Sequence, residues 1–249
     1  SVEKPMEVNT QIQLTLEPSC ISGNDVLKVE HLSKSFPNQT LFQDISFEIK
    51  RGEHVAIIGD NGTGKTTLLK ILNEVLPADG GTFILGTNVH IGYYDQEHHV
   101  LNMEKTIFDE ISDAYPSLTG TRIRNMLAAF LFTGDDVFKR IKELSGGERG
   151  RVSLAKLMLS EANFLILDEP TAGLDPEERI HFRNLFSHAA QDRLVLLSTH
   201  IIEDVQSVCD QLVVIDRGQI LFTGTPERIV NICLASISAL IIYWTVYVS

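Results

Sequence analysis

One glycine-rich turn has the composition of a phosphate-binding loop. Residues 59–66 read GDNGTGKT, which fits the P-loop (Walker A) pattern. Glycines let the backbone fold round an anion so that its N–H groups point at phosphate oxygens, and a helix N-terminus adds favourable potential. Lys65 is expected to reach the β- and γ-phosphates, and the Thr66 hydroxyl to bind Mg²⁺. The candidate nucleotide-binding residues in this turn are Gly59, Asn61, Gly62, Gly64, Lys65, Thr66 and Thr67.

Two adjacent acids, Asp168 and Glu169, follow a short apolar run. The run reads FLIL at residues 164–167 and is typical of a buried strand. Ligands of open α/β sheets bind beyond the carboxyl ends of the strands. Asp168 is therefore expected to hold Mg²⁺, mostly through its water shell, and Glu169 to polarise an attacking water. Solvated acids that merely end a strand are the alternative, and the P-loop makes it the weaker one.

Further elements must position these residues. The apolar run HVAIIG at residues 54–59 predicts a buried parallel strand, and a helix is expected from Lys65 to about Leu76. Another buried strand is predicted at 193–199, and Asp175 followed by Pro176 predicts the start of a helix. Strands that alternate with helices indicate an α/β domain with a largely parallel core sheet.

Other segments lie outside this alternation of buried strands and helices. Short alternating strands are expected at residues 26–30 and 44–50, with a turn at Pro37-Asn38 between them. The runs QLVVID and QILFTG, joined at Arg217-Gly218, predict a closing hairpin. Residues from about 100 to 143 break the alternation and are expected to be helical.

The segment LSGGE at residues 144–148 resembles the signature motif of ATP-binding cassette (ABC) proteins. With the P-loop, LILDEP, an intervening glutamine and a later histidine, residues 26–228 resemble a complete ABC nucleotide-binding domain. The resemblance implies a P-loop NTPase cassette with a mainly parallel core sheet, an antiparallel β subdomain and a small helical subdomain at about residues 97–160. It also implies hydrolysis of ATP with Mg²⁺ as the cofactor.

The resemblance implies a partner as well. In the family, the signature motif completes the ATP site of the opposite cassette. Here that motif comprises Ser145, Gly146, Gly147 and Glu148, at the start of an expected helix whose N-terminus suits a γ-phosphate. A second cassette, as a homodimer or a tandem partner, is therefore expected.

Four more residues gain roles from the resemblance. Gln96, in YYDQ, resembles the glutamine that senses Mg²⁺ and the attacking water, and His200 resembles the switch histidine that contacts the γ-phosphate. Phe36 stands where the family places an aromatic that stacks on adenine, with a core position as the alternative. Asp175, in AGLD, resembles the loop that couples the two sites and can also cap its helix. The expected catalytic residues are thus Glu169, His200 and Gln96, and the expected metal residues are Thr66, Gln96 and Asp168.

Two parts of the chain resemble different branches of the family. Residues 24–170, with IGYYDQEH and LSGGERGRVSLAKLMLSEANFLILDEPT, resemble the second cassette of an ABC-F protein, a soluble translation-factor or ribosome-protection ATPase. Residues 171–228 resemble the ATPase subunits of exporters. A chimera and an unusual single lineage both account for this. The first hypothesis is an ATPase that powers transport with membrane permease subunits. The alternative is an ABC-F-like, ribosome-associated translation or antibiotic-resistance factor.

Composition and chain ends add further expectations. With 33 Asp+Glu against 21 Lys+Arg, the net charge of −12 argues against a protein whose whole surface grips nucleic-acid phosphates. Three scattered cysteines indicate reduced thiols in the cytoplasm. Residues 1–25 are expected to be a linker or extension, and a first residue other than Met indicates a fragment. Residues 229–249 carry no charged side chain; a membrane span, an apolar element packed on the domain and a truncation scar are the alternatives.

Overall fold

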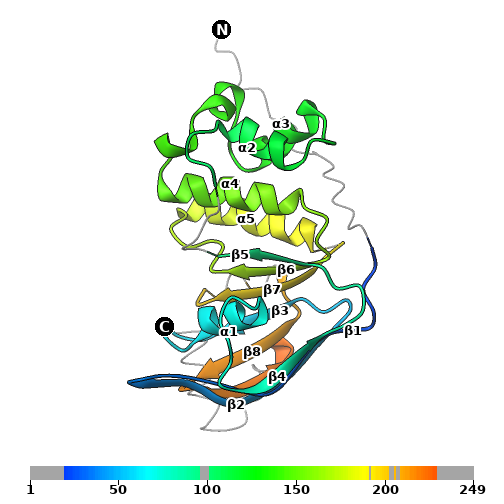
Figure 1. Cartoon of the computed structure of the whole chain (residues 1–249), viewed down its shortest axis with the longest axis vertical. Coiled ribbons are helices and arrows are strands. Elements are labelled where there is room, and N and C mark those ends of the chain that lie inside the picture. Colours follow the sequence, from blue (N-terminus) through cyan, green and yellow to red (C-terminus); the bar gives the residue numbers. More distant parts are fainter. Residues whose placement is uncertain (1–19, 96–100, 191, 202–204, 206–207, 229–249) are drawn as a thin grey trace. The chain divides into compact units, whose positions relative to one another are not determined.

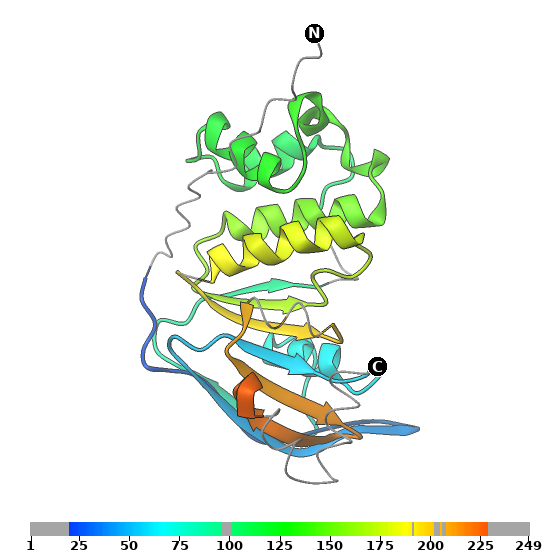
Figure 2. The same cartoon turned by 180° about the vertical axis from the view of Figure 1, so that it is seen from behind.

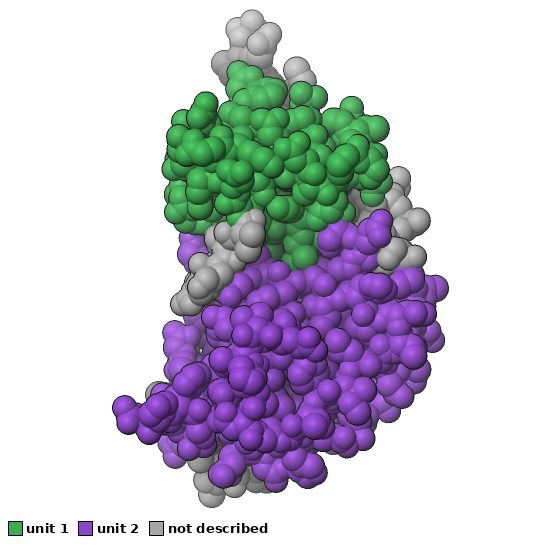
Figure 3. Space-filling model, in the orientation of Figure 1, with its two compact units in different colours: residues 1–16, 101–159 green, residues 17–100, 160–249 purple. Residues whose placement is uncertain are grey.

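The computed structural model describes residues 20–95, 101–190, 192–201, 205 and 208–228. These residues belong to two compact units, each described here by itself (Figure 3). The smaller unit contains residues 101–159, and the larger contains the other described residues. The predictions for Gln96, for the tail at 229–249 and for residues 1–19 lie outside the described residues.

A six-stranded sheet forms the centre of the larger unit (Figures 1 and 2). Its strand order is β5-β6-β7-β3-β8-β9; all neighbours pair in parallel except the β8–β9 hairpin. The strands are β3 (Val55–Ile58), β5 (Ile91–Tyr94), β6 (Phe164–Asp168), β7 (Leu194–Thr199), β8 (Gln211–Asp216) and β9 (Gln219–Gly224). The fully buried strands β3, β6 and β7 are the apolar runs of the sequence, as a parallel sheet covered on both faces requires.

An antiparallel sheet of order β2-β1-β4 forms the second layer of this unit. It comprises β1 (Asp25–Phe36), β2 (Gln39–Lys50) and β4 (Gly80–Leu85). Strands β1 and β2 are longer than predicted, because their pairing continues across several bulges as far as the turn at Pro37-Asn38. The extra pairing carries Phe36 to the very end of β1, opposite Gln39.

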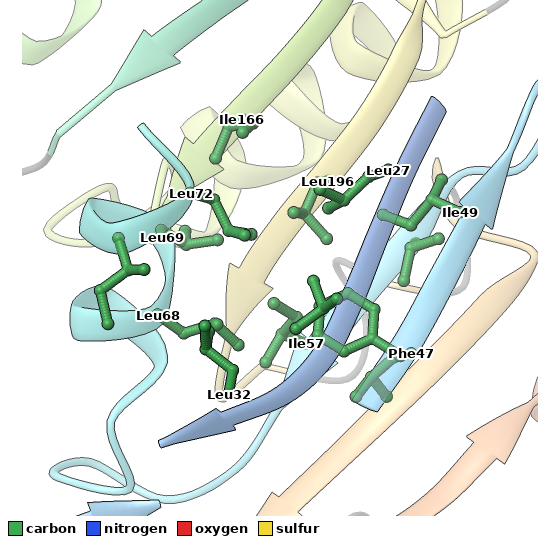
Figure 4. Close-up of a cluster of buried hydrophobic side chains, with 14 of the residues drawn as sticks. Leu27, Leu32, Phe47, Ile49, Ile57, Leu68, Leu69, Leu72, Ile166 and Leu196 are labelled. Carbon is green, nitrogen blue, oxygen red and sulfur yellow. The ribbon is translucent and has the colours of Figure 1, made fainter. Parts of the chain in front are cut away.

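Helix α1 (Lys65–Leu72) joins the two sheets through a shared core. Its Leu68, Leu69 and Leu72 lie in one buried cluster with side chains from both sheets (Figure 4). The helix ends earlier than predicted. The Asn73 side chain donates a hydrogen bond to the Leu69 carbonyl at 2.8 Å, and Glu74 adopts a left-handed φ of 58°, which turns the chain away.

Helix α5 (Pro176–Ala189) begins as the sequence predicts. The Asp175 side chain accepts a hydrogen bond from the Glu178 N–H at 2.8 Å, and Pro176 follows the cap. Phe182, Leu185 and Phe186 follow a helical spacing and are buried, so they form one apolar face of the helix.

The smaller unit is helical, as predicted. It contains α2 (Ile107–Ala114), α3 (Gly120–Ala129) and α4 (Gly146–Met158), with short 3₁₀ helices at Gly134–Phe138 and Ile141–Glu143. No helix within the described part of the chain has the length and apolar character needed to cross a membrane. A mainly parallel sheet, an antiparallel sheet and a helical unit confirm the predicted fold class. The domain limits of 26–228 stay a prediction.

Candidate nucleotide-binding site

The strand order brings three functional segments to one edge of the central sheet. Strands β6, β7 and β3 are neighbours and run parallel, so their carboxyl ends meet at the same edge. The P-loop follows β3, Asp168 ends β6, and His200 follows β7 directly. Segments separated by more than a hundred residues therefore converge where ligands of parallel sheets bind.

The P-loop needs glycine at three places. A Cβ on Gly59 would lie 2.4 Å from the Ile215 carbonyl oxygen, closer than real Cβ atoms approach. Gly62 and Gly64 have φ of 84° and 97°, in the region that side chains disfavour. Gly64 is also the N-cap of α1, so the loop passes straight into the helix N-terminus that an anion prefers.

The Lys65 side chain is folded back into the loop. Its Nζ donates hydrogen bonds to the carbonyl oxygens of Gly59, at 2.6 Å, and Asp60, at 3.1 Å. The same Nζ lies 3.5 Å from Glu169 Oε1. The lysine side chain is only 5% exposed, and neutral acceptors hold its ammonium at the loop with one carboxylate beside it. A phosphate entering the loop would meet a desolvated and positioned positive charge.

Two hydroxyl groups hold the Asp168 carboxylate. Thr66 Oγ1 donates to Asp168 Oδ1 at 3.2 Å, and the Ser198 hydroxyl donates to the same oxygen. Burial raises the pKa of Asp168, and the hydrogen bonds from Ser198 and Thr66 oppose that rise. The sequence analysis did not identify Ser198 as a site residue. The one feature of the sequence that points to it is its position two residues before His200.

The pairing of Thr66 with Asp168 fits a Mg²⁺ ion. Carboxylate and hydroxyl oxygens are ligands that Mg²⁺ prefers, and this ion is usually bound by one or two carboxylates together with substrate phosphates. Among the described residues, no group of three or more His, Cys, Asp or Glu could hold a metal on its own. The donor set therefore suits an ion that arrives with a phosphate ligand. Gln96, the third predicted metal residue, lies outside the described residues.

Glu169 lies between a lysine and a histidine. Its Oε2 is 2.9 Å from His200 Nδ1, and its Oε1 faces Lys65. The backbone of Glu169 has a φ of 47°, a left-handed conformation that costs energy in a residue with a side chain. Its N–H donates to the Ser198 carbonyl oxygen at 3.1 Å and to the hydroxyl at 3.2 Å. Ser198 thus holds both acids at the end of β6.

A cavity of about 440 Å³ opens above these groups. Among the described residues that were predicted to bind nucleotide or Mg²⁺ within this cassette, Gly59 and Asp168 do not line the cavity. Gln39, Leu41 and Ala172 line the cavity although the sequence did not mark them. Gln39 was missed because its position opposite Phe36 depends on the strand register. The predicted residues that line the cavity are Phe36, Asn61, Gly62, Gly64, Lys65, Thr66, Thr67, Glu169 and His200.

The signature segment lies in the smaller unit and forms a helix N-terminus. Ser145 caps α4: its hydroxyl accepts from the Glu148 N–H at 3.2 Å, and Glu148 Oε2 accepts from the Ser145 N–H at 2.7 Å. The hydrogen bond from the Ser145 N–H to the carboxylate, together with one from the Ser145 side chain, lowers the pKa of Glu148. Ser145, Gly146 and Gly147 are exposed, so the start of the helix is accessible to a ligand or a partner.

Comparison with known proteins identifies relatives for much of the chain. The family model described as ABC transporter matches residues 42–172. The putative ATP-binding protein YdiF of Bacillus subtilis is 52% identical over 159 residues, 64% of this chain and 25% of that protein. The probable ATP-binding protein YbiT of Escherichia coli O157:H7 is 37% identical over 209 residues, 83% of this chain and 37% of that protein.

A third relative carries a name that states a process. The energy-dependent translational throttle protein EttA of Haemophilus influenzae is 40% identical over 173 residues, 68% of this chain. The chain spans 31% of that protein, and 25% and 37% of the two others. The similarity therefore concerns one cassette-sized part of longer proteins.

Proposed function

The chain belongs to the ABC transporter family of ATP-binding domains, and from that membership we propose that it hydrolyses Mg-ATP as part of an ABC-F-like, ribosome-associated protein. The observation that carries the ATPase proposal is the convergence of Lys65, Glu169 and His200 on one cavity, with Asp168 hydrogen-bonded to the lining residue Thr66. Each of these side chains is of the type that phosphoryl transfer to water requires.

Catalysis at this site would rest on positioning and charge stabilisation. The loop N–H groups and Lys65 hold the phosphates, and Glu169 orients and polarises a water for in-line attack on the γ-phosphate. His200 steadies the γ-phosphate from the other side of Glu169. Thr66 and Asp168 would hold Mg²⁺, which neutralises charge on the β- and γ-phosphates when it is bound.

The contacts of Lys65 also indicate which interaction a bound nucleotide must displace. The Lys65 ammonium lies 3.5 Å from Glu169 Oε1. A γ-phosphate carries more charge than one carboxylate and takes over this cation, since charge-assisted hydrogen bonds to phosphate are strong. Glu169 is then released to act on water. In the proposed site, phosphate and Glu169 therefore compete for the same lysine.

The relatives favour the ribosomal alternative over transport. Of the three names, the one that states a process names translation, and the two others name ATP binding. Residues 24–170 resemble the second cassette of ABC-F proteins, in agreement with these relatives. The resemblance of residues 171–228 to exporter subunits is the observation that keeps transport as a second candidate.

Co-sedimentation separates the two pathways. We expect the Glu169→Gln chain with Mg-ATP to pellet with bacterial ribosomes through a sucrose cushion, and less of it with ADP, because slow hydrolysis prolongs the ATP-bound state. Wild-type chain with ADP is the control. If the chain instead floats with bacterial membrane vesicles and does not pellet with ribosomes in either ATP or ADP, the transport hypothesis is supported.

A second prediction concerns assembly. In the proposed composite site, the P-loop comes from one cassette and the signature segment from another. A monomer should therefore bind ATP with part of the contacts and turn it over poorly. Mg-ATP is expected to promote a head-to-tail dimer, because its γ-phosphate bridges Lys65 of one chain and Ser145 of the other. Two-fold pairing would bury two nucleotides. Size-exclusion chromatography with light scattering measures this directly.

Two outcomes would contradict the composite site. One is ATPase activity per chain that stays constant on dilution while light scattering shows only monomer. The other is a dimer that forms with ADP and not with ATP, since ADP lacks the bridging phosphate. Ser145→Ala is the matched variant: it should weaken the dimer while each chain still binds ATP through its own P-loop.

A further inference from the structure

The ring of Phe36 has a charged neighbour outside the nucleotide cavity. Lys34 Nζ lies 5.6 Å from the centre of this ring, within the range of a cation–π interaction. The two residues are two apart on β1, so their side chains share one face of the strand. Phe36 lines the cavity, whereas Lys34 is not among the lining residues.

Lys34 is itself held in place by Asp79. Its Nζ donates to Asp79 Oδ1 at 2.7 Å, and the lysine side chain is 9% exposed. The other carboxylate oxygen accepts from the Ser35 N–H at 2.7 Å. The hydrogen bonds from Lys34 and Ser35 lower the pKa of Asp79, so its carboxylate stays charged at neutral pH. Asp79 precedes β4, and its own N–H donates to the Ser33 carbonyl oxygen.

The position of Lys34 bears on the conformation of the Phe36 ring. Phe36 is 45% exposed and ends β1 beside the turn at Pro37-Asn38. An aromatic side chain in such a place populates several rotamers, and binding a ligand would cost the entropy of choosing one. A buried ammonium over the ring favours one rotamer before the ligand arrives, so less affinity is lost on binding.

We propose that Lys34 and Asp79 are positioning residues that pre-order Phe36 to stack on the purine base of ATP. This inference rests on the proposed function, because it takes the cavity to be the ATP site. The inference adds Lys34 and Asp79 to the proposed ATP site. Neither residue is proposed to contact the phosphates or the reacting water. Their effect should therefore depend on the nucleobase alone, whereas a general loss of positive charge or of folding would affect phosphate binding as well.

The test measures binding of two ligands by isothermal titration calorimetry without Mg²⁺. One ligand is ATP, and the other is inorganic tripolyphosphate, which has the phosphates but no base. Lys34→Met and Asp79→Asn should each weaken ATP binding about two- to five-fold, the size of an exposed cation–π contact, and leave tripolyphosphate unchanged. Lys34→Arg should retain wild-type affinity because it keeps the cation.

Two controls make the result specific. Lys28→Met removes another lysine of β1, one that is half-exposed and paired with Glu30 at 2.6 Å, and should change neither affinity. In a Phe36→Ala background, Lys34→Met should have no further effect on ATP. Thermal unfolding of every variant confirms that the compared chains are folded.

Three results would overturn the inference. ATP affinity that falls in Phe36→Ala and not in Lys34→Met would make the lysine purely structural and leave the proposed function intact. Equal weakening of ATP and tripolyphosphate in Lys34→Met would assign its effect to charge. A wild-type chain that does not bind ATP would overturn the proposed function, and this inference with it.

Discussion

Replacing Glu169 with glutamine is expected to preserve ATP binding and to slow hydrolysis by about 10²- to 10⁴-fold, the usual contribution of a general base. The amide keeps the shape of the side chain but cannot polarise water. The contacts of Glu169 add a second expectation. Because the carboxylate faces Lys65 at 3.5 Å, its removal frees that cation for phosphate, so ATP affinity should stay equal or rise. Single-turnover hydrolysis and equilibrium ATP binding measure the two effects separately.

The matched control for this variant is Glu48→Gln. Glu48 is an exposed acid on β2 of the same unit, 3.8 Å from the Lys50 ammonium, so the substitution removes the same charge away from the cavity. Its ATP turnover should equal that of the wild type. If nucleotide affinity and turnover fell together in Glu169→Gln, the residue would be structural. Thermal unfolding of both variants distinguishes a structural loss from a catalytic one.

Lys65→Ala is expected to weaken ATP binding itself and not turnover alone. A charged hydrogen bond to phosphate is worth up to about 3 kcal/mol, which corresponds to roughly a 150-fold loss of affinity. The loss should be larger for ATP than for adenosine, because the lysine reaches only the phosphates. Calorimetric titration with both ligands measures this difference, and Lys28→Ala serves as the control with the same loss of charge.

The structure shows what else Lys65→Ala changes. The variant leaves the Gly59 and Asp60 carbonyl oxygens without their lysine donor and leaves Glu169 beside His200 alone. Some destabilisation is therefore expected, and binding must be measured well below the unfolding temperature. Unchanged ATP affinity in a folded Lys65→Ala chain would rule out the assigned role of the P-loop.

Local chemistry was readable from the sequence. The turn of the P-loop, the cap at Asp175 and the hairpin at Arg217-Gly218 follow from glycines that tolerate unusual backbone angles and from a side chain that suits a helix N-cap. The apolar runs of β6 and β7 likewise indicated buried strands. Such features depend on a few consecutive residues, and for that reason the fold class and most lining residues of the cavity could be predicted.

Contacts between side chains that are distant in the sequence depend on the tertiary structure. Thr66 reaches Asp168 across 102 positions of sequence, and Ser198 reaches it across 30. No local pattern encodes these distances, because they follow from the order β6-β7-β3 in the sheet. The same holds for Asp79, which reaches Lys34 only because β4 pairs with β1. The reactive groups and their local backbone thus follow from consecutive residues, whereas sheet packing sets their neighbours, their electrostatic surroundings and their solvent exposure.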